Sequence, residues 1–392
     1  MKHVYIVIGL GFGDEGKGLC TDYLCAKHKP ASTIVVRFNG GHQAGHNVVI
    51  GDRQHVHSNF GSGTLRGYSS YFSKYCTVYP ITLYNEWIVL LEKKIAPDLI
   101  IDPMAIVTTP YDVIYNQFRE EEKNHGSCGL GIGSTMHRHN TSGYKVFAAD
   151  LTNKKVLTLK LANLRTYYLN QLKLEGYSTE AIIDYSNQCS ELMTQYLDAV
   201  EILFLRQPPI IKVSKLDMAQ YNAIIFEGAQ GVMLDMDHGI FPNVTYSNTT
   251  SKNALELCSE WDLNDISIFY ITRCYQTRHG YGPMTSDENV SLVNNADEIN
   301  VYNKWQKEFK TKKIDYDLIN FALKIDSCYH PEWSKCRIDT NLLITCNDQL
   351  PDFEFDTTQL KFRGRIYKSY APDQKGIIKQ KLIYENQNSG KS

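Results

Sequence analysis

The sequence predicts an α/β protein with a large, mostly parallel central sheet flanked by helices. Short β-branched runs recur along the chain, helical stretches separate them, and the first run opens into a glycine loop that leads into a helix. Uninterrupted apolar runs are typical of strands covered on both faces, and alternating strands and helices favour a parallel sheet. The strand-like runs are Val4–Ile8, Thr33–Arg37, Leu99–Ile101, Ala223–Phe226, Ile266–Thr272 and Leu342–Thr345.

The longest of the expected helical stretches is one insertion. Residues 155–206 are rich in Leu, Glu, Gln and Lys and predict two or more helices, and residues 315–325 predict another. Since no linker rich in Pro, Gly or Ser marks a boundary, we expect one α/β domain over residues 1–384, followed by a polar tail at 385–392. The long loops between elements predict small subdomains built from insertions.

Composition excludes several classes of protein. The chain has 392 residues, 43% of them hydrophobic, which is enough for a sizeable core, and its formal net charge of −2 does not indicate a nucleic-acid polymer as partner. The ten cysteines include no CxxC pair, so no zinc site is predicted from them. Without a signal peptide we expect a cytoplasmic protein with reduced thiols. The apolar opening is far shorter than the roughly 20 residues of a membrane span.

The first glycine loop has the spacing of a phosphate-binding loop. Gly11 to Lys17 reads GxxxxGK, but Gly18 stands where Ser or Thr would hold Mg²⁺, and Asp14-Glu15 lies inside the loop. Backbone N–H groups at a helix N-terminus bind phosphate, and a lysine adds charge. Asp14 could hold Mg²⁺ or remove a proton. A strand–turn–helix whose glycines only allow tight packing is the alternative, and the spacing, lysine and helix together favour phosphate.

Two further glycine-rich loops are candidates for ligand binding. The loop 37–47 carries His42 and His46 four residues apart, a spacing that would suit a metal pair on a helix, but its three glycines disfavour a helix and therefore zinc. We expect one of these histidines to contact phosphate or act as a general acid. The loop 126–135 has four glycines with interleaved hydroxyls; it suits an anion-binding nest or a flexible surface loop.

A fourth loop follows the run Ala223–Phe226. Gln230 lies after this strand, where its amide can present a donor and an acceptor to a purine edge. The residues Asp235, Asp237 and His238 could bind a metal, but capping of turns is the favoured interpretation. The run 247–250 supplies neutral donors for phosphate.

Together these motifs resemble the adenylosuccinate synthetase family. The matching segments follow one another over roughly the first 285 residues, and they are Gly13–Gly18, Asn39–His46, Phe226–Gly231, Asp235–Gly239, Ser247–Thr250 and Thr277–Pro283. The resemblance implies a Mg²⁺-dependent ligase that uses a nucleoside triphosphate, usually GTP, to join aspartate to C6 of IMP through a 6-phosphoryl intermediate. It also implies a homodimer.

The resemblance assigns roles to individual residues. Asp14 would take the N1 proton and bind Mg²⁺ with the carbonyl of Gly45, Lys17 and Gln230 would stabilise the 6-oxyanion, and His46 would act on the transferring phosphate. The other nucleotide-phosphate ligands would be Gly13, Glu15, Gly16, Gly18, Gly45, Asn39, Ser127, Cys128, Thr245 and, from the partner subunit, Arg138. The C-terminal part, about 340–384, would read the base of the triphosphate: Thr345–Asp348 resembles a purine-reading motif in which Asp348 favours guanine, and Ser369 begins a loop that packs on that base.

The chain departs from the family where aspartate should bind. Lysines of the segment 303–315 replace the family's arginine cluster, which leaves Lys310 and Lys312 as candidate ligands for aspartate. A shorter phage-type branch of the family also lacks this cluster and joins aspartate to dGMP, giving 2-amino-2'-deoxyadenylosuccinate. The sequence therefore predicts a ligase acting on IMP, with dGMP as the alternative acceptor.

A different class, an inactive nucleotide-binding homologue with a regulatory role, is also consistent with the missing arginines. The joint presence of Asp14, Lys17, His46 and Gln230 favours the enzyme, because binding alone does not require all four.

Overall fold

The computed structural model of the chain describes residues 2–123, 129–280, 282–293, 308–330 and 336–380. Two expected phosphate ligands, Ser127 and Cys128, and the expected tail 385–392 lie outside the described residues.

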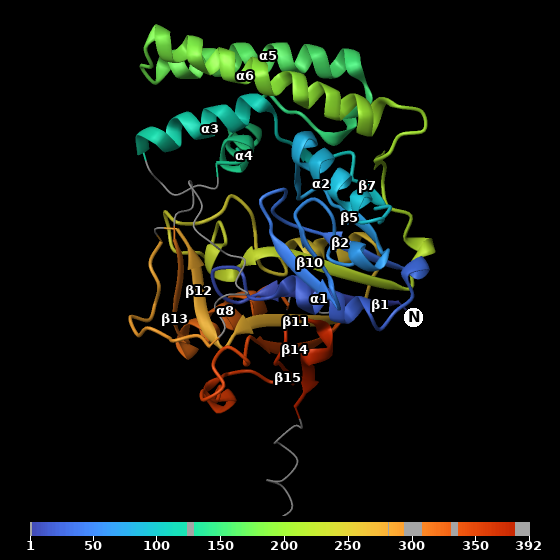
Figure 1. The fold of residues 1–392 in the computed structure, drawn as a ribbon, viewed down its shortest axis with the longest axis vertical. Helices are drawn as coiled ribbons and strands as arrows, with labels where there is room; N and C mark the ends of the chain where they lie inside the picture. Colours follow the sequence, from blue (N-terminus) through green and yellow to red (C-terminus); the bar gives the residue numbers. More distant parts are fainter. Residues whose placement is uncertain (1, 124–128, 281, 294–307, 331–335, 381–392) are drawn as a thin grey trace, which may run out of the picture.

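A ten-stranded sheet forms the centre of the molecule (Figure 1), and its strand order is β16-β15-β14-β11-β1-β10-β2-β5-β7-β9. All neighbouring strands are parallel except β15 and β16. The predicted α/β class is confirmed, and every predicted strand belongs to this sheet. The strands are β1 His3–Gly9, β2 Thr33–Arg37, β5 Ser69–Phe72, β7 Leu99–Ile101, β9 Lys212–Val213, β10 Ala223–Gly231, β11 Asp265–Arg273, β14 Arg337–Thr345, β15 Arg365–Ser369 and β16 Ile377–Lys379.

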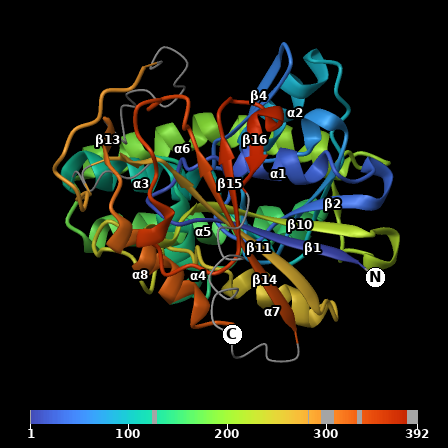
Figure 2. The same ribbon diagram turned by 90° about the horizontal axis from the view of Figure 1, so that it is seen from below.

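Helices cover both faces of the sheet. Along β1, Ile6 and Ile8 pack on one side with α7 (Lys252–Glu260) and α8 (Tyr316–Ser327), whereas Val7 packs on the other side with α1 (Lys17–Cys25). Figure 2 shows α1 and α7 on opposite sides of the strands. Since successive side chains of a strand point to opposite faces, a strand buried on both sides must be apolar throughout. This is why the strands of the sheet could be predicted from the sequence.

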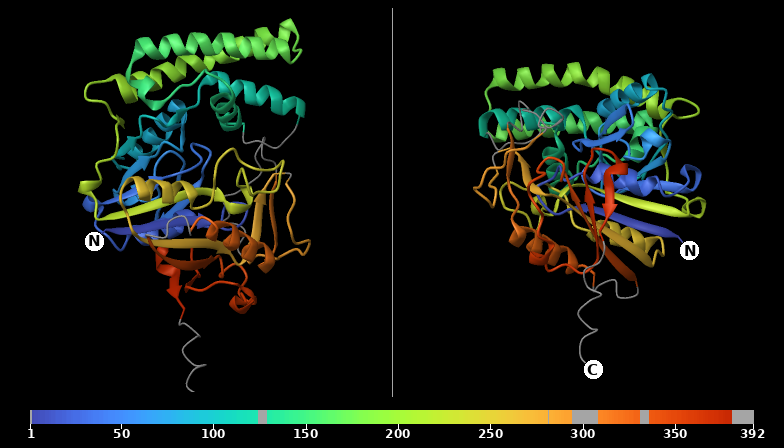
Figure 3. Two further views of the ribbon diagram at one scale, coloured as in Figure 1. Left: turned by 180° about the vertical axis from the view of Figure 1, so that it is seen from behind. Right: turned by 60° about the horizontal axis from the view of Figure 1, so that its bottom comes forward.

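A separate helical layer lies beyond one edge of the sheet. The long helices α5 (Lys154–Leu174) and α6 (Thr179–Val200) lie side by side at the end of the molecule opposite β15 (Figures 1 and 3). Buried Leu157, Leu161, Leu164 and Tyr168 follow the helical period on α5 and share a core with α6. The helical insertion predicted at 155–206 therefore holds two helices. The layer also contains α2 Pro80–Glu92, α3 Pro110–Lys123 and α4 Ile132–Thr141.

Small two-stranded sheets accompany the central sheet. They are β3 (His46–Ile50) with β4 (Arg53–His57), β6 (Thr77–Val78) with β8 (Ile106–Val107), and β12 (Tyr275–His279) with β13 (Phe309–Lys313). The β3–β4 pair is an antiparallel hairpin that presents His46 at its first position. Among the described residues, no helix has the length and apolar character needed to cross a membrane.

Candidate active site

The candidate loops meet at the carboxyl edge of the parallel sheet. The loop after β1, residues 10–16, which we call the phosphate loop, leads into α1, and it lies between the ends of β10 and β11. Its carbonyl oxygens accept hydrogen bonds from Arg273 Nε (to Asp14 O, 2.6 Å), Thr277 Oγ1 (to Gly13 O, 3.0 Å) and Thr345 Oγ1 (to Glu15 O, 2.7 Å). Open parallel sheets bind ligands at this edge.

The carboxylate of Glu15 fills the inside of the phosphate loop. It accepts from Gly11 N (3.0 Å), Gly13 N (2.9 Å) and Lys17 Nζ (2.5 Å). Its pocket depends on glycine, because a Cβ at Gly9 or Gly231 would lie 2.2 Å or 2.5 Å from a Glu15 oxygen. The Glu15 side chain is thus an acceptor bound to the loop's own donors, so the predicted contact of Glu15 with phosphate would come from its backbone.

Gly18 has little room for a side chain. A Cβ there would lie 3.0 Å from both His46 Cβ and Asn47 O, and 3.2 Å from Ser62 Oγ. The β3–β4 hairpin thus packs against α1 where a phosphate-binding loop usually carries its Ser or Thr. This contact is the physical reason for the glycine.

Asp14 lies at the surface of the phosphate loop in a left-handed conformation, with φ 60°. Its side chain is 24% exposed, and its Oδ2 lies 3.6 Å from His279 Nε2. Burial raises the pKa of Asp14, while His279, Arg273 and Lys17 oppose the rise. A carboxylate whose pKa moves toward neutrality is suited to removing a proton. His279, at the end of β12, belongs to a segment that the sequence analysis matched to the family without giving it a role.

Gln230 faces the phosphate loop from the end of β10. It also adopts a left-handed conformation, with φ 62°, and its Cα would lie 3.8 Å from a Cβ at Gly13. Its Nε2 donates to Thr245 Oγ1 (3.0 Å), which brings two predicted site residues together. Its buried Oε1 has no hydrogen-bond partner in the described part of the chain. A buried amide oxygen without a donor is free to accept from a ligand.

His46 is held by a buried carboxylate that the sequence analysis did not single out. Its Nδ1 lies 2.9 Å from Glu227 Oε1, and Glu227 also accepts from the backbone and hydroxyl of Ser62. Burial lowers the pKa of His46, and Glu227 only partly opposes this. Burial alone would raise the pKa of Glu227, but His46, Arg37 and Ser62 outweigh it and bring it to about 2. An ionised Glu227 fixes the Nδ1–H tautomer and leaves Nε2 of His46 for a ligand.

Asn39 has a structural role that the sequence analysis did not predict. It is fully buried, its Oδ1 accepts from Ala229 N (2.7 Å), and its Nδ2 donates to Ala229 O (3.1 Å). The amide therefore joins the loop after β2 to the end of β10. Asn39 thus positions the strand end that carries Gln230, and its predicted contact with phosphate stays a prediction.

Arg138 cannot serve a neighbouring subunit. Its side chain is 1% exposed and donates to both carboxylate oxygens of Asp112 (2.7 and 3.0 Å) and to the carbonyls of Val107 and Tyr144. These bonds tie α4 to α3 inside the same chain. The expectation that Arg138 binds phosphate across a dimer interface is wrong, because a buried guanidinium with these partners is part of the interior.

The remaining predicted residues lie around this centre. Lys310 Nζ donates to Gly282 O, and Lys312 Nζ donates to Asp287 O and Asn289 Oδ1, so both lysines tie β13 to the preceding segment. Asp348 is partly exposed after β14, and the buried Ser369 donates to Ala371 O. Asp235 accepts from the backbone of Asp237, His238 and Thr249, which confirms turn capping.

Comparisons with known proteins agree on one family. A family model described as adenylosuccinate synthetase matches residues 6–313. The adenylosuccinate synthetase of Borrelia duttonii is 28% identical over 396 residues, covering 97% of this chain and 86% of the relative. That of Pseudomonas syringae pv. syringae is 34% identical over 289 residues, covering 72% of this chain and 64% of the relative.

Two solved structures share the fold. A fully ligated adenylosuccinate synthetase from Plasmodium falciparum aligns with a TM-score of 0.70 at 18% identity, covering 97% of this chain and 100% of the other. A cyanophage S-2L succinoaminodeoxyadenylate synthetase, bound to dGMP and to dATP as an energy donor, aligns with a TM-score of 0.63 at 15% identity, covering 97% and 95%.

Proposed function

Because the chain belongs to the adenylosuccinate synthetase family, a family of ligases in purine biosynthesis, we propose that it joins aspartate to C6 of IMP and cleaves GTP to GDP and phosphate. The observation that carries this proposal is the convergence of Asp14, Lys17, Gln230 and His46 from three separate loops at one edge of the sheet. These groups supply a base, a cation, an amide and an imidazole.

The first step is proton removal from N1 of the 6-oxopurine by Asp14. The raised pKa of Asp14 supports this role, since a base works best when its pKa approaches the working pH. Lys17 and Gln230 stabilise the negative charge that develops on O6. Lys17 has three donors, of which the bond to Glu15 uses one, and Gln230 lies beside the loop.

The O6 oxyanion then attacks the γ-phosphorus, GDP leaves, and a 6-phosphoryl nucleotide forms. The amine of aspartate attacks C6, the C6–O bond breaks, and phosphate departs while the new nitrogen loses a proton. Phosphoryl transfer of this kind depends on positioning and charge neutralisation. Nε2 of His46 is the group that faces the transferring phosphate in this proposal, because Glu227 already engages Nδ1.

Residues suited to Mg²⁺ are present. The Asp14 carboxylate lies too far from His279, at 3.6 Å, for a strong hydrogen bond, and Gly45 is exposed at the start of the β3–β4 hairpin. A carboxylate and a carbonyl are the hard oxygen donors that Mg²⁺ prefers, and we propose that they hold it. When bound, the ion would neutralise charge on the phosphates.

The nucleotide and aspartate ligands follow the same proposal. The backbone of Gly13, Gly16 and Gly18 and the hydroxyl of Thr245 would bind phosphate, with Ser127 and Cys128 completing the set. Asp348 and the loop that begins at Ser369 would contact the guanine base, and Lys310 and Lys312 would attract the carboxylates of aspartate. The two lysines bond to backbone carbonyls, which leaves further donors on each ammonium. A homodimer would have to form its shared site without Arg138.

The second candidate acceptor is dGMP. Lysines stand where the family has its arginine cluster, and the phage synthetase that shares the fold was solved with dGMP. Asp14 fits both acceptors, since each carries a 6-oxo group and an N1 proton.

The deciding experiment supplies Mg²⁺ and aspartate with GTP or ATP and either IMP or dGMP, and follows phosphate release together with the mass of the purine product. We expect phosphate and adenylosuccinate with IMP. If dGMP gave product and IMP gave none, the acceptor would be dGMP and not IMP. Nucleotide binding without phosphate release for either acceptor would favour the regulatory homologue. The Asp14→Asn variant serves as the inactive control.

A further inference from the structure

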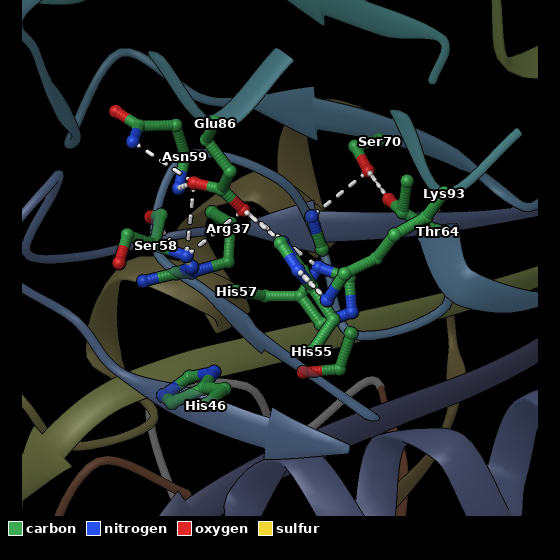
Figure 4. A network of polar contacts seen from close by, with 12 residues as sticks. Arg37, His46, His55, His57, Ser58, Asn59, Thr64, Ser70, Glu86 and Lys93 are labelled. Carbon is green, nitrogen blue, oxygen red and sulfur yellow. Dashed lines mark hydrogen bonds and ion pairs between the residues drawn. The ribbon is translucent and has the colours of Figure 1, made fainter. Parts of the chain in front are cut away.

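A second cluster of ionisable side chains lies behind the hairpin that carries His46. His55 and His57 lie on β4, and Glu86 lies on α2; all three are buried. One nitrogen from each histidine and one oxygen of Glu86 lie within 4.8 Å of one another. Figure 4 shows the two imidazoles and the carboxylate facing each other. The reaction proposed above uses none of the three.

The carboxylate is oriented by the backbone so that one oxygen faces the histidines. Glu86 Oε2 accepts from Asn59 N (2.6 Å), Asn59 Nδ2 (3.0 Å) and Ser58 N (3.1 Å). Glu86 Oε1 also receives a longer bond from Ser58 N (3.2 Å), but it lies 3.3 Å from His55 Nε2 and 3.8 Å from His57 Nδ1. Ligands at about 2.0–2.2 Å from a tetrahedral zinc ion lie about 3.4 Å apart. Both distances to Glu86 Oε1 are thus close to that spacing, and a nitrogen of each imidazole lies within 4.8 Å of the other.

His57 gives an independent reason to expect a ligand. Its side chain is 0% exposed, and among the described residues neither ring nitrogen has a hydrogen-bond partner. A buried polar group left without a partner costs roughly 1–3 kcal/mol. A neutral imidazole with free nitrogens is the form that binds metals.

We propose that His55 Nε2, His57 Nδ1 and Glu86 Oε1 bind a zinc-class divalent metal ion, with water in the remaining position. Two imidazoles and one carboxylate form a ligand set that zinc accepts in proteins. The ion would join β4 to α2. Because His46 and His57 are paired residues of the β3–β4 hairpin, it would also stabilise the hairpin that presents His46.

The surrounding charges define what must change when the ion binds. Lys93 Nζ lies 3.1 Å from His55 Nδ1 and donates to Gln54 O. A metal on Nε2 requires a proton on Nδ1, so the ammonium of Lys93 must move away, which its exposed position on the surface permits. On the inner side, Arg37 donates to Ser58 O at 3.4 Å, and the nearby carboxylate of Glu227 offsets its charge. Lys93→Met should therefore bind the ion several-fold more tightly, because it removes a like charge.

The test measures metal binding by the full-length protein, independently of activity. Chelator-treated protein is titrated with Zn²⁺ in competition with a chromophoric chelator, and bound zinc is counted by mass spectrometry after dialysis. We expect one ion per chain and a rise in melting temperature. His57→Leu and Glu86→Gln should each lower the affinity at least 100-fold. His28→Gln is the matched control, since His28 bonds Tyr5 OH outside the cluster.

A folding control keeps the proposal falsifiable. In chelator, His57→Leu should melt no lower than the unsubstituted protein, because the substitution removes an unpaired buried imidazole, so that lost zinc binding would reflect lost ligands. The proposal fails if the unsubstituted chain takes up no zinc at micromolar concentrations. It also fails if His57→Leu binds as tightly as the unsubstituted chain, or if His28→Gln loses as much affinity as His57→Leu.

Discussion

Gly18, in the first turn of α1, is the position at which the phosphate-binding motif differs most clearly from its usual sequence, which has Ser or Thr there. A serine there would bring its Cβ to 3.0 Å from His46 Cβ and Asn47 O. We expect Gly18→Ser to lower the free energy of unfolding by about 1–3 kcal/mol, the usual cost of overpacking. Displacing His46 should also lower kcat at least tenfold, because small misplacements of reacting groups are costly. Denaturant unfolding and steady-state kinetics measure the two effects.

The control for this substitution is another glycine. Gly143 is exposed, and a Cβ there meets no atom within 4 Å, so Gly143→Ser should change neither stability nor kcat. If Gly18→Ser behaved like Gly143→Ser, the packing of the β3–β4 hairpin on α1 would not be what excludes the hydroxyl.

Asp14 governs the second prediction at the scale of single residues. Asp14→Asn keeps the shape of the side chain but cannot take a proton, so we expect kcat to fall about 10²–10⁴-fold while calorimetry shows nucleotide binding within a few-fold of normal. Since burial raises the pKa of Asp14, its basic form is populated only above that raised value. The acid limb of kcat/KM should therefore lie above the ordinary carboxyl pKa of about 3.9 and should be absent from the residual activity of the variant. Near-normal turnover of Asp14→Asn would contradict its role as base.

At the scale of elements, the contact between α3 and α4 depends on one buried ion pair. Arg138→Gln would leave the buried Asp112 without its cation, and we expect a loss of about 3–5 kcal/mol in the free energy of unfolding. The exposed pair Arg337–Asp339 provides the control, since Arg337→Gln should cost at most about 1 kcal/mol. A fully stable Arg138→Gln protein with impaired kcat would instead support a role for Arg138 in catalysis.

The central strands were predictable because burial on both faces makes each of them a continuous apolar run. Thr33–Arg37 and Leu99–Ile101 match the observed bounds of β2 and β7, whereas Ala223–Phe226 continues to Gly231 as β10. The hairpin β3–β4 was not predicted because the buried positions of β4 are His55 and His57, so this strand carries no apolar run.

The residues of the candidate site could be predicted only where they belong to a sequence motif whose spacing indicates a function. Asp14, Lys17 and Gln230 stood out because glycine-rich turns after strands place them at the sheet edge. The role of Glu227 was not predicted, because Glu227 and its partner His46 are 181 positions apart in the sequence. The same holds for the cluster of His55, His57 and Glu86: alternate histidines on one strand were a signal, but the carboxylate comes from another element and no motif connects them.

For the whole molecule, buried histidines predict a loss of stability in mild acid. His42 and His57 are 3% and 0% exposed, and burial lowers their pKa values to about 4 and about 3. In the unfolded chain both return to about 6.5. Between these values the unfolded state binds more protons than the folded state, so stability is highest above pH 6.5 and falls as the pH decreases.

The size of this effect makes it measurable. Each of the two histidines contributes about 1.4 kcal/mol per pH unit below pH 6.5, so the pair should cost about 2.8 kcal/mol per unit down to about pH 4. The contribution of Glu227 is lost at lower pH than that of the histidines. Because its pKa is lowered to about 2, ionised Glu227 stabilises the folded state fully above pH 4.5, and this stabilisation is lost as the pH falls toward 2. Denaturant unfolding of the chelator-treated protein between pH 7.5 and 4.5 tests the sign and the slope. His57→Leu should lower the slope by about 1.4 kcal/mol per pH unit over this range, because it removes one titrating group. A stability that stays constant from pH 7.5 to 5 would show that these imidazoles are already protonated or hydrated in the folded chain.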